Sequence, residues 1–127
     1  MSLRATGTYT VALKPLPATD ATISRMSLEK TFEGDLAGTG AGEMMAVTTG
    51  TPGSAGYVAM ERVTGTLGGR SGSFVFQHSS MADRGTPTQS IQVVPDSGTE
   101  GLAGLRGTFV IAMDGKEHRY VFDYTLP

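Results

Sequence analysis

The chain has 127 residues, no cysteine and a formal net charge of -2. This length suits one domain, so we expect residues 1–127 to fold around a single core. The acidic balance, without a basic run, argues against binding to nucleic acid or to an anionic membrane. The lack of cysteine excludes disulfides, thiolate metal sites and a cysteine nucleophile, and it fits a cytoplasmic protein. No apolar run approaches the ~20 residues of a membrane-spanning helix.

Glycine accounts for 18 of the 127 residues. Helices tolerate glycine poorly, whereas tight turns, bulges and barrel corners use it. Together with frequent threonine and valine, this composition predicts an all-β protein.

The N-terminal part of the chain predicts three strands. Alternating polar and apolar residues indicate strands over residues 3–14 and 23–32. The prolines within residues 14–20 are expected to end the first strand, because proline has no N–H to donate to a ladder. The glycine-rich segment 33–42 is expected to be a connection, followed by a third strand over residues 42–49.

Residues 57–82 predict the central hairpin of the fold. Valine, phenylalanine, tyrosine and threonine alternate there with polar residues, and Gly68-Gly69 can take the positive φ angles of a tight turn. The two strands are the fourth and fifth of the chain, and they hold its most reactive side chains.

The segment 96–107 is a longer stretch for which no strand is predicted. It follows a sixth strand over residues 88–95. Gly101 and Gly104 disfavour a stable helix, so we expect a single helical turn or a packed loop anchored by the leucines of the segment.

A second hairpin, with strands over residues 108–113 and 116–126, ends the chain. Asp114-Gly115 lies between them and is a strong signal for a type I′ turn, which would place the residues on either side of it opposite one another. The aromatic face of this hairpin is assigned to the interior and carries Phe109, Ile111, His118, Tyr120, Phe122 and Tyr124.

The turn signals divide the chain into about eight antiparallel strands, each expected beside its neighbour in the sequence. Long strands in this number rarely stay an open sheet, because closure removes the exposed edges. We therefore predict a single antiparallel eight-stranded β-barrel of meander topology rather than a sandwich. Such a barrel is filled by side chains or is just wide enough for one small ligand.

Four segments carry a resemblance to a known family: GAGEM (40–44), YVAMERVTGTLGGRSGSFVFQH (57–78), VVPDSGTEGLAGLRGTF (93–109) and FDYTLP (122–127). Together they resemble the bacterial family called domain of unknown function 3224, over nearly the whole chain. The resemblance implies a calycin-like β-barrel of the allene-oxide-cyclase type. Allene oxide cyclases bind an unsaturated fatty-acid epoxide in the barrel, but their site residues cannot be placed on this sequence. Because the family has no established activity, the resemblance implies the fold and no chemistry.

The central hairpin decides which residues share a face. If Gly68-Gly69 is a two-residue loop, Glu61 lies opposite Phe76 and Ala59 lies opposite His78, and opposite residues share a face. The face richer in aromatic residues is assigned to the interior and carries Tyr57, Ala59, Glu61, Val63, Phe74, Phe76 and His78.

Glu61 and His78 are the candidate catalytic residues. They are diagonal neighbours on this inner face, with Cα atoms roughly 7–8 Å apart, close enough for their side chains to meet. A carboxylate in apolar surroundings and an imidazole can pass a proton between them, as general acid–base catalysis requires. The alternatives are a buried pair that only holds two strands together, and a surface ion pair of Glu61 with Arg62 or Arg119.

Tyr57, Phe74, Phe76 and Tyr124 are the candidate walls of a ligand site, although core packing explains them equally well. The two histidines have no zinc-ligand spacing. The glycine-rich segments lack the following helix that phosphate binding uses. No metal and no cofactor is therefore predicted.

These patterns lead to a functional hypothesis with two alternatives. The hypothesis is a barrel that binds a small, largely apolar molecule in its mouth, with Glu61 and His78 as polar anchors. The first alternative is a cofactor-free isomerase or cyclase that uses the same pair for proton transfer, so whether the protein is an enzyme stays open. The second is a structural or interaction module with a solidly packed barrel. We also expect a homo-oligomer, assembled through the outer face of the barrel.

Overall fold

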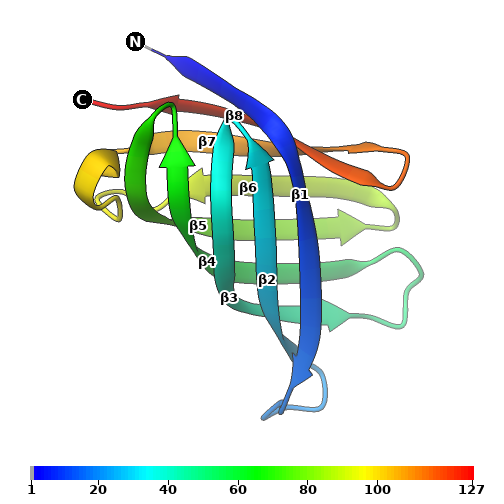
Figure 1. Ribbon diagram of the computed structural model, residues 1–127. Coiled ribbons are helices and arrows are strands. Elements are labelled where there is room, and N and C mark those ends of the chain that lie inside the picture. The colour runs from blue at the N-terminus through cyan, green and yellow to red at the C-terminus, as the bar shows by residue number, and fades with distance from the viewer. Residues whose placement is uncertain (1) are drawn as a thin grey trace.

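The computed structural model describes residues 2–127, so Met1 lies outside the described part of the predicted domain. It is a closed antiparallel barrel in which the strands follow one another in chain order, and β8 pairs with β1 (Figure 1). The prediction of an all-β, eight-stranded meander barrel is confirmed. The elements are β1 (Leu3–Leu16), β2 (Ser24–Gly34), β3 (Leu36–Thr48), β4 (Ala55–Leu67), β5 (Arg70–Asp83), β6 (Thr86–Val93), the 3₁₀ turn η1 (Glu100–Leu102), β7 (Arg106–Asp114) and β8 (Glu117–Thr125).

One end of the barrel, which we call the closed end, is filled by aromatic side chains. Phe122 is fully buried there, and its ring lies 6.0 Å from that of Phe74 and 5.3 Å from that of Phe76. The segment around η1 packs against the start of β5 and covers this end (Figure 1). Leu102 and Leu105 of this segment are fully buried, as expected for its anchors.

Tyr120 ties the closed end together by hydrogen bonds. Its hydroxyl accepts from the backbone N–H of Leu36 at 2.9 Å and lies 3.0 Å from the carbonyl of Leu36 and 3.1 Å from that of Glu33. The turn between β2 and β3 is thereby held against a core side chain from β8. Burial raises the pKa of the Tyr120 hydroxyl, so the group stays a neutral donor and acceptor.

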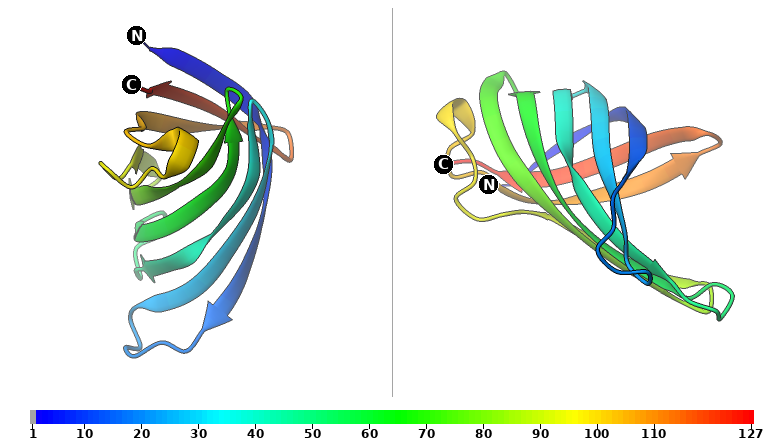
Figure 2. Two further views of the ribbon diagram at one scale, coloured as in Figure 1. Left: turned by 60° about the vertical axis from the view of Figure 1, so that its left-hand side comes forward. Right: turned by 90° about the horizontal axis from the view of Figure 1, so that it is seen from below.

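The other end is open because the strands differ in length. β1 pairs with β8 from Leu3 to Tyr9, whose partner is His118, whereas β1 itself continues to Leu16. Figure 2 shows the β7–β8 hairpin diverging from β3–β6 toward this end. We call the mouth the inner face of β1–β6 beyond the pair of Tyr9 and His118, together with Met113 at the end of β7.

The seam between β6 and β7 also opens toward the mouth. Within residues 2–127 these two strands pair at a single position, Gln92 with Thr108. Neighbouring strands elsewhere in the barrel pair over seven or more positions, as β1 does with β8. The barrel is therefore held most firmly at its closed end.

The central hairpin has the predicted register. Gly68 and Gly69 form the loop with φ angles of 57° and 82°, and Leu67 lies opposite Arg70. Glu61 is consequently opposite Phe76, and both side chains face the interior. The expected loop between β6 and β7 is also confirmed, with η1 as its single helical turn.

The expectation that the glycine-rich segment 33–42 is a connection is wrong, because β3 begins at Leu36. Glycines 38, 40 and 42 recur with the period of a strand and all face inward. Omitting a side chain lets neighbouring strands and long side chains approach the backbone closely, so these glycines belong to a tightly curved wall.

The expectation that proline ends the first strand at residue 14 is also wrong. Pro15 pairs with Met26 of β2, and the strand runs on to Leu16. The other side of β1 has no β8 partner beyond Tyr9, so the missing N–H of Pro15 costs no ladder hydrogen bond there.

The last hairpin is shifted by two residues from its predicted register. Asp114 lies opposite Glu117, so the loop is Gly115-Lys116 rather than Asp114-Gly115. Gly115 has a φ of 64° at the first loop position, which suits glycine-first hairpin loops. Because the shift is even, each residue keeps the face that was predicted for it.

Candidate functional site

Three polar side chains lie buried together at the base of the mouth: Lys30 of β2, Glu61 of β4 and His78 of β5, which we call the polar cluster. The Nζ of Lys30 donates to the Oε1 of Glu61 at 3.1 Å, and the Nε2 of His78 lies 2.9 Å from the same oxygen. An ionised carboxylate only accepts hydrogen bonds, so the Nε2 of His78 carries the proton in this contact. The other carboxylate oxygen, Oε2 of Glu61, has no partner within residues 2–127.

Gly40 makes room for this carboxylate. A Cβ on Gly40 would lie 2.1 Å from the Oε2 of Glu61, and 3.0 Å from its Cδ. The Glu61 side chain therefore lies flat against the bare backbone of β3. Across that backbone it reaches Lys30, which comes from the strand on the other side.

Sequence reasoning brought Glu61 and His78 together and missed Lys30. The sequence did contain a sign of this role, because Lys30 lies between Leu28 and Phe32 on the apolar face of its strand. Without a known partner, a lysine at such a position suggests that the buried part of the strand ends there. The surface alternative for Glu61 is excluded, since Glu61 is fully buried and Arg119 pairs instead with Asp114 and Glu117.

Aromatic rings hold the ammonium group of Lys30 in place. Its Nζ lies 4.8 Å from the centre of the Tyr9 ring, and the Tyr9 ring in turn lies 4.9 Å from that of His118. Burial, and secondarily the charge of Glu61, raises the pKa of Tyr9 to about 12. Tyr9 is therefore a neutral wall beside the cluster at physiological pH.

The four predicted wall residues occupy two different places. Tyr57 is half-buried at the mouth, where its hydroxyl accepts from the Nε2 of Gln89 at 2.9 Å. Phe74, Phe76 and Tyr124 are buried in the closed end. Their rings pack against other core rings, so they support the base of the mouth from below.

Apolar residues of the mouth point inward and still remain exposed. Leu13 pairs with the buried Leu28, so it shares the inner face, yet it is 48% exposed. Val11 on the same face is 37% exposed, and Met113 at the end of β7 is 58% exposed. The inner wall above the polar cluster is thus apolar and open to solvent.

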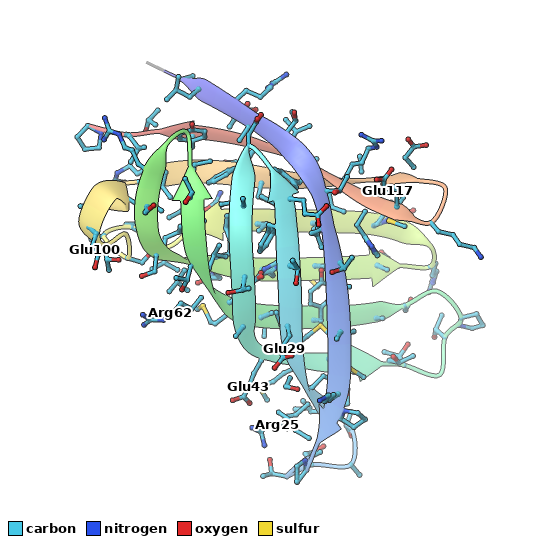
Figure 3. The ribbon with its side chains drawn as sticks, viewed as in Figure 1. Arg25, Glu29, Glu43, Arg62, Glu100 and Glu117 are labelled. Atoms are coloured by element: carbon cyan, nitrogen blue, oxygen red, sulfur yellow. The ribbon has the colours of Figure 1, made fainter. Side chains whose placement is uncertain are left out.

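The outer face of β3–β5 carries a second group of exposed apolar residues, namely Met45, Val58, Met60 and Met81. Charged residues on the outside of these strands, such as Glu43 and Arg62, point away from the barrel (Figure 3). This group lies where a homo-oligomer was expected to assemble, and the oligomer stays a prediction.

Two features are absent from the described residues 2–127, a metal-binding cluster and a membrane-spanning helix. No group of three or more histidine, aspartate or glutamate side chains there is arranged to hold a metal ion. No helix in this part of the chain is long and apolar enough to cross a membrane.

Comparisons with known proteins place the fold in a family. The model of a family described as "Protein of unknown function (DUF3224)" matches residues 5–124. The chain is also similar to a protein with unknown function from the DUF3224 family, from Shewanella oneidensis MR-1, whose crystal structure is known at 1.84 Å. The two sequences are 39% identical, and the two structures superpose with a TM-score of 0.97. The match covers 100% of this chain and 98% of that chain. No curated protein sequence matches the chain. The implied likeness to allene oxide cyclases stays a prediction.

Proposed function

This chain belongs to the DUF3224 family, and we propose that it binds a small, largely apolar molecule in the mouth of its barrel. The proposal places the ligand above the polar cluster and outside the packed closed end. It keeps Glu61 and His78 as the polar anchors, with Tyr57 beside them, and adds Lys30.

One observation carries this proposal: apolar side chains on the inner face are exposed at the mouth. Leu13 is 48% exposed, whereas Leu36 on the inner face of the closed end is fully buried. A concave apolar wall with a few convergent polar groups is the usual form of a small-molecule site. A ligand that covered Leu13, Val11 and Met113 would remove their apolar surface from water, which is favourable by about 25 cal/mol per Å².

The polar cluster can orient a ligand bound at such a site. Within residues 2–127 the Nζ of Lys30 makes one hydrogen bond, to Glu61, and an ammonium group has three donors. In the neutral tautomer of His78 whose Nε2 donates to Glu61, the Nδ1 is an acceptor. A hydroxyl or carbonyl group on an apolar ligand would find a donor and an acceptor here.

The test is a fluorescence titration with Nile red, a neutral apolar probe. Leu13→Asp places a carboxylate on the inner wall and is expected to weaken probe binding by at least about tenfold, or about 1.4 kcal/mol. Val58→Asp is the matched control, since Val58 is 54% exposed on the outer face of β4. Equal binding by both variants and the wild type would refute the proposal, and so would a greater loss in Val58→Asp.

Proton-transfer catalysis is a second candidate function, favoured by the 2.9 Å contact between the Nε2 of His78 and the Oε1 of Glu61. Molecules extracted from the purified protein after native mass spectrometry would serve as substrates. If Glu61→Gln keeps affinity for such a molecule but stops its conversion, the protein is an isomerase or cyclase. If both are unchanged, Glu61 has no part in either function.

A further inference from the structure

We propose that Lys30 is a nucleophilic amine, which forms a reversible imine with the carbonyl group of an aldehyde or ketone held in the mouth. This inference rests on the proposed function, because the apolar part of the carbonyl compound must bind to the mouth. It assigns chemistry to a residue for which the sequence predicted none.

The arrangement around Lys30 is that of an activated nucleophile. Its Nζ lies 3.1 Å from the Oε1 of Glu61, which can take the ammonium proton. His78 in turn holds that oxygen from the other side at 2.9 Å. A nucleophile and a base within hydrogen-bond reach, with a third group that orients the base, is the pattern that supports covalent catalysis.

Lys30 differs from the other lysines of the chain in its surroundings. Its side chain is 7% exposed and lies beside the rings of Tyr9 and Phe32, at 4.8 Å and 5.9 Å from Nζ. Buried lysines with a positioned partner form Schiff bases in other proteins. Lys14 and Lys116, the other lysines of the chain, are exposed.

Lys30 is also the most exposed member of the polar cluster. Lys30 is 8% exposed, His78 is 4% exposed and Glu61 is fully buried. The carboxylate of Glu61 lies against Gly40, which is the partner of Lys30 on β3, so the Nζ of Lys30 meets the carboxylate near its own level of the barrel. A carbonyl compound in the mouth would reach Nζ through the exposed part of this side chain.

A purely structural pair does not account for this cluster well. Desolvating two charges costs several kcal/mol per ion, and apolar residues of similar size often replace buried ion pairs without loss of stability. The cluster also leaves the Oε2 of Glu61 without a partner within residues 2–127, and an unsatisfied buried acceptor costs about 1–3 kcal/mol. An unsatisfied buried acceptor of this kind calls for an explanation, and a role at a binding site supplies one.

The reaction is balanced without an oxidant or a reductant. The ammonium proton of Lys30 passes to the Oε1 of Glu61. The free amine attacks the carbonyl carbon, and the attacking nitrogen passes one of its protons to the carbonyl oxygen. The resulting carbinolamine loses its hydroxyl group as water with the proton returned by Glu61, which leaves a protonated imine. The sum is one carbonyl compound and one ammonium group giving one protonated imine and one water.

The test is reductive trapping on the full chain, with naphthaldehyde as the probe and sodium cyanoborohydride as the reductant. Peptide mapping by mass spectrometry then gives the label at each lysine. At limiting probe we expect Lys30 to be labelled about 100-fold faster than Lys14 or Lys116, the low end of what a positioned base contributes. Naphthylmethanol, which has the same apolar part and no carbonyl, is expected to compete with this labelling.

Labelling of Lys30 no faster than that of Lys14 and Lys116 overturns the inference, and this result needs no variant that might misfold. Glu61→Gln, if folded by circular dichroism, is expected to lower the Lys30 rate about 100-fold, and an unchanged rate would remove Glu61 as the base. If naphthylmethanol binds to the mouth and Lys30 is not trapped, the proposed function stands and the inference fails. If neither probe binds, both fail.

Discussion

The two ends of this barrel are built from the same strands and differ in what their inward-facing residues touch. At the closed end, Leu36 and Phe122 are fully buried among aromatic rings. At the mouth, Leu13 occupies an equivalent inward position on β1 and remains 48% exposed. The difference arises because β7 and β8 are shorter than β1–β5, and so part of the wall has no opposite side. The closed end thus supplies stability, and the inner face of the mouth stays open to solvent.

The polar cluster lies at the boundary between these two regions. Below it the interior is apolar and packed, and above it the inner face meets solvent. Charged groups at such a boundary are desolvated on one side and reachable from the other. This position distinguishes Lys30 from the exposed lysines and Glu61 from the surface carboxylates.

The largest effect is expected from Lys30→Met, which leaves the carboxylate of Glu61 buried without its cation. Removing one partner of a buried ion pair costs about 3–5 kcal/mol, so the unfolding free energy from urea denaturation should fall by that amount. The double variant Lys30→Met, Glu61→Leu should recover most of the loss, because no charge then stays buried. A double variant as unstable as the single one would show that the ion pair itself stabilises the barrel.

A matched pair of leucine truncations compares the two ends directly. Leu36→Ala at the closed end should cost about 2–5 kcal/mol, as fully buried leucines do. Leu13→Ala at the mouth should cost less than about 1 kcal/mol, because its side chain is already half in water. Equal losses, measured by thermal or urea denaturation, would contradict the division of the barrel into two regions.

Gly40→Ala tests the space beside the polar cluster. The added methyl group would lie 2.1 Å from the Oε2 of Glu61, so the carboxylate must move. We expect a loss of about 1–3 kcal/mol in unfolding free energy, typical of overpacked sites. In a Glu61→Ala background the same change should cost much less, and a double-mutant cycle without coupling would mean that Glu61 does not depend on Gly40.

The smallest effect is expected from Tyr9→Phe, and only in alkali. Because burial and Glu61 raise the pKa of Tyr9 to about 12, the folded state holds its proton more tightly than the unfolded chain does. The stability that this proton contributes is present below pH 10 and is lost as the pH rises from 10 toward 12. The decline of unfolding free energy over that range should be shallower in Tyr9→Phe than in the wild type, with equal slopes counting against the raised pKa.

The sequence predicted which residues face inward better than it predicted where the strands begin and where they stop pairing. Gly68-Gly69 defined one loop, and from that loop alone the neighbours of Glu61 followed with the correct register. The glycine-rich start of β3 was misjudged, because inward glycines resemble a loop unless the strands that they approach are known. The mouth could not be predicted, since it depends on where β8 stops pairing with β1.

The polar cluster was predicted in part for the same reason. Glu61 and His78 belong to one hairpin, so local pairing places them on one face. Lys30 reaches Glu61 only across β3, and that contact requires the long-range order of β2, β3 and β4. The position of Lys30 on an apolar face was the one sign of this contact in the sequence, and that position does not identify a partner.

The most direct measurement is a methyl NMR titration of the labelled protein with naphthylmethanol, because methyl groups mark both faces of the same strands. The account predicts saturable shifts for the inward methyl groups of Val11, Leu13, Met26 and Met44, with little change at Val58, Met60 and Met81 outside. Shifts centred on the outer methyl groups, or no saturable shift at the mouth, would contradict it.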